Sequence, residues 1–174
     1  MKVYPEKLSQ ALSAGVAPIY IVSGDEPLLV QECCDSIRAA ARKANYAERE
    51  VFHVEAGFDW KEFIYSASSL SLFADQKLLE LRMSSAKPGN EGASSLKEYA
   101  AMPSSSNLLL VSLPRLDKGT QNAQWFKVLE KAGVFIQIWP VAGKDLPRWI
   151  DARFKKVGLK ATREAVMSMA ARVE

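Results

Sequence analysis

The sequence predicts an α/β fold, with a mainly parallel sheet of five strands between helices, followed by part of a small all-helical domain. Short apolar runs alternate with helical patterns as far as Val141, and this alternation is typical of parallel sheets that are covered by helices. After Val141 the strand signals stop and only helical patterns follow. Hydrophobic residues make up 48% of the chain, which is enough for a buried core.

The expected strands are short apolar runs between turn-forming residues. The run NLLLVSL is the most uniformly apolar of them, which indicates a strand that is buried on both faces. Because helical patterns separate the strands, each crossover connection is expected to be right-handed. The five expected strands are Pro18–Ser23, Arg49–Val54, Lys77–Met83, Asn107–Leu113 and Val134–Val141.

The expected helices carry apolar residues at helical spacing. The segment Pro27–Lys43 places four of them on one stripe, namely Leu29, Cys33, Ile37 and Ala40. Such a stripe is typical of a helix that packs on a sheet. The stretch SSAKPGNEGASS, residues 84–95, contains Pro and Gly and predicts a flexible loop. The other expected helices are Pro5–Gly15, Trp60–Ala67, a short one from Leu96, Asn122–Lys131, Asp145–Val157 and one from Thr162 onward.

Composition and charge exclude several classes of protein. The net charge of +3 is too small to indicate a nucleic-acid-binding protein by itself. The N-terminus lacks the pattern of a signal peptide, and no apolar run approaches the roughly 18 residues that span a bilayer. We therefore expect a cytoplasmic protein without a membrane segment.

Cysteine and histidine are too few for a metal site. Cys33 and Cys34 are adjacent and His53 is the one histidine, so no zinc site of the usual spacing can form. Adjacent residues of a helix point in different directions, so a mutual disulfide is not expected and packed, reduced thiols are. His53 lies in an expected strand, where a structural role is favoured over a catalytic one. We expect no metal, no cofactor and no catalytic residue.

Gly24 lies where a phosphate-binding loop would lie, between a strand and a helix. Such a loop needs a second glycine, a lysine and a hydroxyl group, but Asp25, Glu26 and Pro27 follow. The two acids repel phosphate, and the proline lacks an N–H donor. Gly24, Asp25, Glu26 and Pro27 therefore form a degenerate position that is not expected to bind nucleotide, and Asp25 is expected to cap the next helix.

A bulky apolar group lies in the connection before the third strand. Leu70, Ser71, Leu72 and Phe73 fall between an expected helix and an expected strand. Connections normally avoid such side chains unless they pack inward or meet a partner. The residues alone leave both interpretations open and favour packing at the base of the sheet.

Several stretches of the sequence resemble the delta subunit family of the bacterial DNA polymerase III clamp loader. The resemblance runs over the whole chain, and GDEPLL is its most specific motif. The matching stretches are Tyr4–Leu8, Ile21–Glu32, Ser71–Ala74, Lys77–Leu79, Gln124–Phe126 and Leu146–Trp149.

The resemblance implies a domain organisation and a role. It implies an AAA+/RecA-like domain over residues 1–141 that does not hydrolyse ATP, and the start of a helical second domain over residues 142–174. A third, collar domain would lie beyond Glu174, and an end inside an apparent helix suggests part of a longer protein. The family's role is to bind the beta sliding clamp and open it for loading onto primed DNA. Its other partners are the gamma/tau and delta prime subunits, and any nucleotidyltransferase activity belongs to the complex.

The resemblance also assigns the apolar connection a function. In the family a Leu–Phe pair at this position enters an apolar pocket of the clamp, so Leu72 and Phe73 would be the anchors, with Leu70 and Ser71 beside them. Clamp-binding peptides often begin with glutamine, whereas this sequence has Ser68 and Ser69 at the candidate positions. The polar end of the contact would therefore differ.

Two alternatives belong to other functional classes. The first is a nucleic-acid-binding module formed by the basic C-terminal helices, although such runs are more often solvated helix faces. The second is a degraded P-loop enzyme with residual nucleotide affinity. The basic residues of the first alternative are Lys144, Arg148, Arg153, Lys155, Lys156, Lys160 and Arg163.

Overall fold

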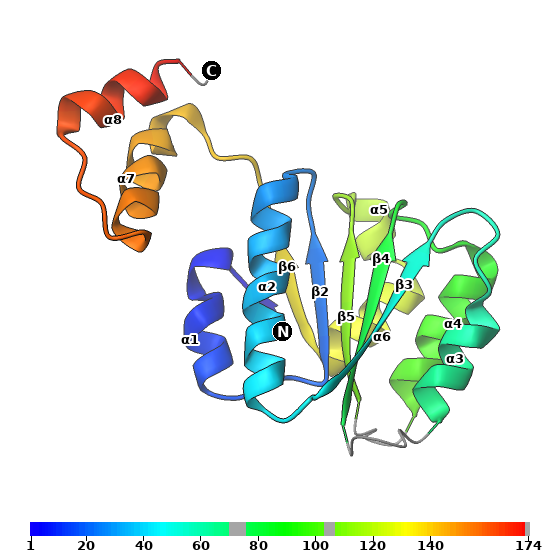
Figure 1. Cartoon of the computed structure of the whole chain (residues 1–174). Helices are drawn as coiled ribbons and strands as arrows, with labels where there is room; N and C mark the ends of the chain where they lie inside the picture. Colours follow the sequence, from blue (N-terminus) through cyan, green and yellow to red (C-terminus); the bar gives the residue numbers. More distant parts are fainter. Residues whose placement is uncertain (70–75, 103–106, 173–174) are drawn as a thin grey trace. The chain divides into compact units, whose positions relative to one another are not determined.

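The computed structural model describes residues 1–69, 76–102 and 107–172 (Figure 1). The chain divides into two compact units, Met1–Ile138 and Trp139–Glu174. The first unit holds the whole sheet and the second is helical. Each helix of the described segments is too short or too polar to cross a bilayer.

The described residues form a parallel sheet with the strand order β1-β6-β2-β5-β4-β3. In its centre Ile21 of β2 lies opposite Val111 of β5, and Leu79 of β4 lies opposite Leu109. The parallel α/β arrangement is thus confirmed, but the number of strands is six rather than five. The strands are β1 (Lys2–Val3), β2 (Ile19–Ser23), β3 (Glu48–Val54), β4 (Lys77–Met83), β5 (Asn107–Leu113) and β6 (Val134–Gln137).

Strand β1 is the one that sequence reasoning missed. It contains only Lys2 and Val3, which pair with Phe135 and Ile136 of β6. Two residues are too short to show the alternation or the apolar run that predicts a strand. The strand exists because the edge of β6 offers free backbone groups to pair with.

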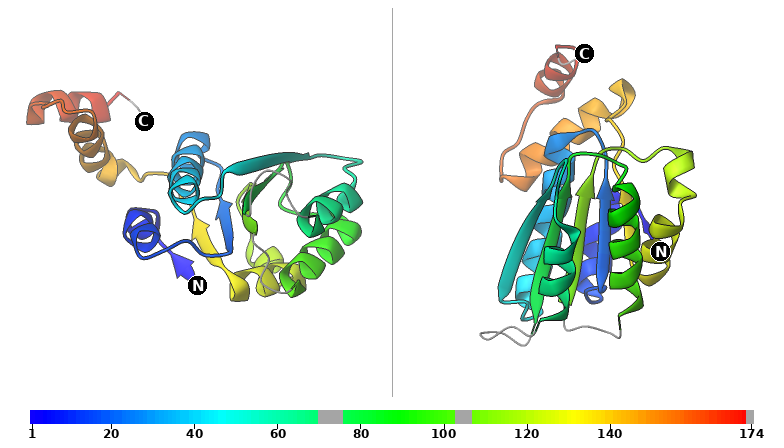
Figure 2. Two further views of the ribbon diagram at one scale, coloured as in Figure 1. Left: turned by 60° about the horizontal axis from the view of Figure 1, so that its bottom comes forward. Right: turned by 90° about the vertical axis from the view of Figure 1, so that its right-hand side faces the viewer.

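Helices cover both faces of the sheet (Figure 2). One face packs against α1 and α2, and the other packs against α3, α4 and α6. Strand β2 contributes side chains to both faces, since Tyr20 and Val22 belong to one apolar cluster and Ile21 belongs to the other. The helices of this unit are α1 (Leu8–Ser13), α2 (Pro27–Lys43), α3 (Trp60–Ser68), α4 (Gly89–Ala101), α5 (Lys118–Gln121) and α6 (Gln124–Ala132).

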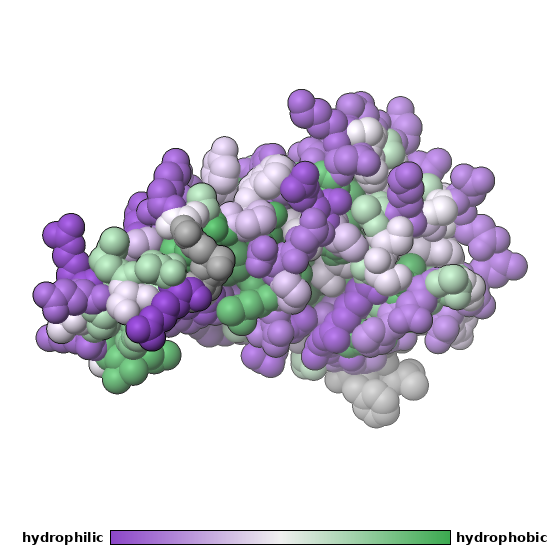
Figure 3. All heavy atoms as spheres, turned by 90° about the horizontal axis from the view of Figure 1, so that it is seen from above, coloured by the Kyte–Doolittle hydropathy of each residue, from purple (hydrophilic) through white to green (hydrophobic). Residues whose placement is uncertain are grey.

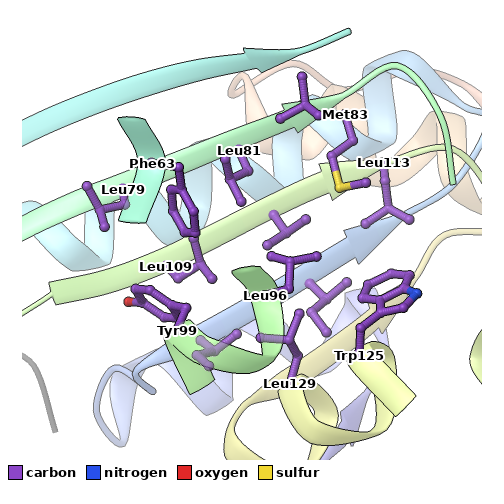
Figure 4. Packing of buried hydrophobic residues seen from close by; sticks show 14 of the residues in the cluster. Phe63, Leu79, Leu81, Met83, Leu96, Tyr99, Leu109, Leu113, Trp125 and Leu129 are labelled. Carbon is purple, nitrogen blue, oxygen red and sulfur yellow. The ribbon is translucent and has the colours of Figure 1, made fainter. Parts of the chain in front are cut away.

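The larger core lies under α3, α4 and α6. Figure 4 shows Phe63 of α3 and Tyr99 of α4 in one cluster with leucines of β4 and β5. The rings of Phe63 and Tyr99 lie 5.6 Å apart, centre to centre. Leu79 and Leu109 are fully buried beneath these helices, so this side of the sheet excludes water.

Helix α4 corrects the prediction of a flexible loop over residues 84–95. The helix begins at Gly89, so the second half of that stretch is helical. A Cβ atom on Gly92 would lie 2.4 Å from the Trp60 ring, so this glycine allows α4 to approach α3 closely. Glycines and serines lower helix propensity, and here tertiary packing outweighs it. The short helix α5 was also not predicted.

The cysteines pack in the smaller core under α1 and α2. Cys33 and Cys34 are both buried and unpaired, as predicted. Burial raises the pKa of Cys33 to about 11 and that of Cys34 to about 12. Since the thiolate is the reactive form, both thiols are inert near neutral pH.

The second unit contains α7 (Leu146–Lys156) and α8 (Arg163–Ala170). Ile150 of α7 is buried with Val166 and Ala170 of α8. The guanidinium of Arg153 stacks on the Trp149 ring, 3.9 Å from its centre. The stacked pair lies within α7, and the cluster of Ile150, Val166 and Ala170 joins the two helices.

Candidate functional site

The degenerate phosphate-loop position lies at the carboxyl end of β2. Helix α2, which follows β2, covers one face of the sheet, and α6, which follows β5, covers the other. Neighbouring strands with helices on opposite faces mark the place where open α/β sheets usually bind ligands. Gly24, Asp25, Glu26 and Pro27 therefore form the turn where a nucleotide would be expected.

At this position hydrogen bonds join the carboxyl ends of β2 and β5. The hydroxyl of Ser23 donates to the Pro114 carbonyl over 3.0 Å and accepts from the Leu116 N–H over 3.0 Å. The Gly24 N–H donates to the Leu113 carbonyl over 3.2 Å. The first backbone donor of this turn, the Gly24 N–H, is thus engaged with the end of β5.

Asp25 does not cap α2, contrary to the prediction. Its Oδ1 accepts a hydrogen bond of 2.9 Å from the Arg115 N–H, which links the two loops. The residue at the cap position is Glu26, whose side chain makes no capping hydrogen bond. The acidic side chain thus joins the loop after β5 to the turn after β2 and does not cap the start of α2.

Gly24 has a packing role at this turn. A Cβ atom here would lie 2.6 Å from the Cβ of Ile138 and 3.0 Å from its carbonyl oxygen. The Ile138 N–H also donates to the Ser23 carbonyl over 2.7 Å. The glycine therefore allows the chain after β6 to pass close to β2. Figure 3 looks onto this edge of the sheet, where hydrophilic residues dominate.

A cavity of about 530 Å³ lies elsewhere along the carboxyl ends of the strands. It is bounded by the loops after β3 and β4 and by the start of α4, with Trp60, Met83 and Lys87 in its wall. None of the four residues of the degenerate position lines it. It is therefore separate from the turn that follows β2.

The predicted clamp-binding residues Leu70, Ser71, Leu72 and Phe73 lie outside the described residues. They belong to the connection between α3 and β4, and both of these elements are described. The two ends of the connection are therefore defined by the contacts of α3, β4 and β5.

Buried polar side chains hold the carboxyl end of α3. Lys77, the first residue of β4, donates from Nζ to the Ser66 carbonyl and, over 3.0 Å, to the Ser66 hydroxyl. Asn107, the first residue of β5, donates from Nδ2 to the Ala67 carbonyl over 2.7 Å. The last carbonyls of a helix lack intrahelical partners and favour cations. Lys77 and Asn107 thus fix the point where the chain leaves α3.

The charge of Lys77 is balanced nearby. Its Nζ lies 3.6 Å from the Glu50 carboxylate of β3, and the same carboxylate accepts a hydrogen bond from the Ser66 hydroxyl. Sequence reasoning missed this cluster. Its signal in the sequence was that β4 and β5 each begin with a polar residue directly before leucines, and the structure shows both polar residues to be buried.

We expect Asn107→Ala to destabilise the protein by about 1–3 kcal/mol, because it leaves the buried Ala67 carbonyl without its donor. The matched control is Asn122→Ala, which removes a similar 3.0 Å bond to the Lys118 carbonyl at an exposed helix end. Exposed groups regain water, so the control should change stability by less than about 0.5 kcal/mol. Urea unfolding of both variants measures the difference, and equal effects would contradict the capping role.

The remaining candidates from the sequence are dispersed. His53 is exposed on β3. In the described ranges, no three His, Cys, Asp or Glu side chains are placed to hold a metal ion. Among the basic residues of the second unit, Lys155 pairs with Asp151 over 2.7 Å. Most of the others are exposed, namely Lys144, Arg148, Lys156, Lys160 and Arg163.

Comparison with known proteins identifies similar sequences and folds. Residues 20–138 match the family model described as DNA polymerase III, delta subunit. DNA polymerase III subunit delta of Haemophilus influenzae is 30% identical over 174 residues, covering 97% of this chain and 49% of that protein. The chain spans about half the length of the curated relatives it matches.

Two solved structures show a similar fold at low sequence identity. The Bacillus subtilis DNA clamp loader delta protein has a TM-score of 0.68 at 18% identity, covering 93% of this chain and 50% of its own. Thermotoga maritima RuvB has a TM-score of 0.54 at 14% identity, covering 95% of this chain and 54% of its own. The AAA+-like fold that the sequence predicts is thereby confirmed.

Proposed function

Because the chain belongs to the delta subunit family of DNA polymerase III, we propose that it binds the beta sliding clamp and opens the ring for loading onto primed DNA. The observation that carries this proposal is the family match over residues 20–138, which covers the sheet domain from β2 to the end of β6. The parallel sheet with its AAA+-like fold supports it. The resemblance found in the sequence is consistent with this membership.

In this proposal Leu72 and Phe73 are the anchors, and Leu70 and Ser71 lie beside them. Full burial of two such side chains yields roughly 3–6 kcal/mol before the costs of association. Large apolar anchors of this kind dominate the energy of many interfaces. The fixed end of α3 supports the proposal, since Lys77 and Asn107 hold the residues from which the anchor segment starts. Because the end of α3 is already held in place, that end loses less conformational entropy when the clamp is bound.

Opening the ring follows from differential affinity. A partner shifts an equilibrium between closed and open clamp only as far as it binds the open form more tightly. The chain would open the ring by binding the open form more tightly than the closed form, without a chemical step of its own. We therefore assign any nucleotidyltransferase activity to the holoenzyme and not to this subunit.

We also propose that the chain does not hydrolyse ATP. The hydrogen bonds that join the turn after β2 to the end of β5 and the loop after it support this, as do the acids beside Gly24. ATP would act on other subunits of the loader. We expect those partners to be the gamma/tau and delta prime subunits, with primed DNA reached through the complex in the cytoplasm. We also propose that residues 1–141 and 142–174 belong to separate domains.

Titration of this chain against the sliding clamp, followed by fluorescence anisotropy, tests the proposal. We expect saturable binding with the same Kd in the presence and absence of Mg-ATP. Absence of binding would contradict the clamp role, whereas a Kd that changes with Mg-ATP would contradict the loss of the nucleotide site. The two parts of the proposal therefore fail separately.

A further inference from the structure

A buried carboxylate in the sheet gathers three arginines. The side chain of Glu80, in β4, is fully buried. It accepts hydrogen bonds from Arg38 of α2 over 2.6 and 3.0 Å and from Arg49 of β3 over 2.9 Å. It also accepts one from Arg82, two residues further along β4, over 2.8 Å. One acid thus fixes guanidinium groups from three elements.

The cluster lies on the two outer strands of the sheet, β4 and β3. Strand β3 is the last strand of the sheet order, with Val51 opposite Glu80 and His53 opposite Arg82. The apolar cluster under α1 and α2 includes Leu78 of β4 but no buried residue of β3. On this face the apolar cluster ends at Leu78, and two of the arginines lie on the two outer strands beyond it.

The charges of the cluster do not balance. Three guanidinium groups meet the Glu80 carboxylate, and the second acid, Asp35, pairs with Arg38 over 2.5 Å. Arg38 is largely buried, whereas the side chains of Arg49 and Arg82 are each 41% exposed. The positive charge in excess therefore belongs to the two arginines that face solvent.

The hydrogen-bonding capacity is also unequal. A carboxylate offers about four lone-pair sites, and Glu80 already takes bonds from all three arginines. A guanidinium carries five N–H donors in a rigid fork. Glu80 is saturated, while Arg49 and Arg82 each retain donors for a second acceptor. Their Nε–H bonds to Glu80 orient both groups in advance, which lowers the cost of binding.

We propose that Arg49 and Arg82 form a binding site for a phosphate group on this face of β3 and β4. The planar fork of arginine matches the oxygens of phosphate, and such pairs are stronger than neutral hydrogen bonds. A dianion between the two guanidinium groups also relieves their mutual repulsion. The phosphate belongs either to a nucleic-acid backbone or to a free anion, and the same chemistry serves both. The site uses none of the proposed clamp-binding residues.

Thermal unfolding of the whole chain in sodium phosphate, compared with sodium chloride of equal ionic strength, tests the site. A ligand of the folded state raises Tm in a saturable way. The double variant Arg49→Gln, Arg82→Gln keeps amide donors toward Glu80 but lacks both charges. We expect it to need roughly a hundredfold more phosphate for the same shift, at about tenfold for each charged hydrogen bond.

The matched control is Arg148→Gln, Lys160→Gln, which removes the same charge from exposed residues of the second unit. It should respond to phosphate as the parent does. No phosphate-specific shift in the parent, or equal weakening in both double variants, would overturn the proposal. If the double variant does not fold, the single variant Arg49→Gln is used, because this side chain is half-exposed and not buried in the core.

A labelled single-stranded oligonucleotide distinguishes the two sources of phosphate. Anisotropy measures its binding to the parent and its displacement by inorganic phosphate. Displacement, together with loss of binding in Arg49→Gln, Arg82→Gln only, assigns the site to a nucleic-acid backbone. A phosphate shift without oligonucleotide binding at these arginines assigns it to a free anion. Equal loss in the control would show unspecific attraction and contradict a site at these arginines.

Discussion

Replacing Leu72 and Phe73 together by alanine is expected to remove most of the affinity for the sliding clamp. The two side chains are proposed to lie fully buried in the clamp pocket, and their burial contributes roughly 3–6 kcal/mol. This corresponds to a loss of about 10²–10⁴ in Kd. Titrations of the parent and the variant against the same clamp measure it directly.

The matched control replaces an aromatic residue and a leucine on another part of the surface. Tyr4 and Leu28 are 65% and 54% exposed, so Tyr4→Ala, Leu28→Ala removes similar side chains without touching the anchors. The control should keep the parent's Kd. Thermal unfolding separates the interpretations that the sequence left open. If Leu72 and Phe73 fill the base of the sheet, their replacement lowers Tm strongly, and the anchor assignment is wrong.

The second large effect is expected at Glu80. Glu80→Gln leaves Arg38, Arg49 and Arg82 close together without the carboxylate that pairs them. Removing one partner of a buried ion pair typically costs about 3–5 kcal/mol. Urea unfolding should show this loss, whereas Glu98→Gln, an exposed acid on α4, should change stability by less than about 0.5 kcal/mol.

The pH dependence of stability should also report the pairing of Glu80 with the arginines. Burial by itself would raise the pKa of Glu80, but hydrogen bonds from Arg38, Arg82 and Arg49 and the charge of Arg38 outweigh it and lower the pKa to about 2. A lowered pKa stabilises the folded state above the unfolded value of about 4.5. That contribution is lost as pH falls from about 4.5 to 2. The Gln variant should lack this component of acid destabilisation, and an identical acid profile would contradict the pairing.

The sequence predicts the strands that are buried on both faces. The bounds of β4 and β5 match the predicted runs, because both strands carry apolar residues on both faces, as buried parallel strands do. Helix α2 is also predicted to the residue, since Pro27 opens it and a regular apolar stripe follows. Strand β1 and the first half of helix α4, before Leu96, are not predicted. Both depend on contacts between distant residues, with β6 in one case and with Trp60 in the other.

Among the site residues, too, local features can be predicted from the sequence, whereas contacts between distant residues cannot. The absence of a lysine and a second glycine after Gly24 is local and can be read from the sequence. The bond from the Arg115 N–H to Asp25 joins two loops 90 residues apart, so local capping rules assign Asp25 wrongly. Glu80 gives a sequence signal, because an acid inside a buried apolar strand must find partners. Which arginines supply them follows only from the register of β3 on β4 and the position of α2.

Release of the clamp from DNA tests the central claim most directly. The clamp is loaded onto a nicked circular DNA, and its dissociation is followed after addition of an excess of this chain. We predict that the parent accelerates release severalfold, whereas Leu72→Ala, Phe73→Ala leaves the clamp on the circle. If the parent binds the clamp and release stays as slow as without it, the chain does not open the ring.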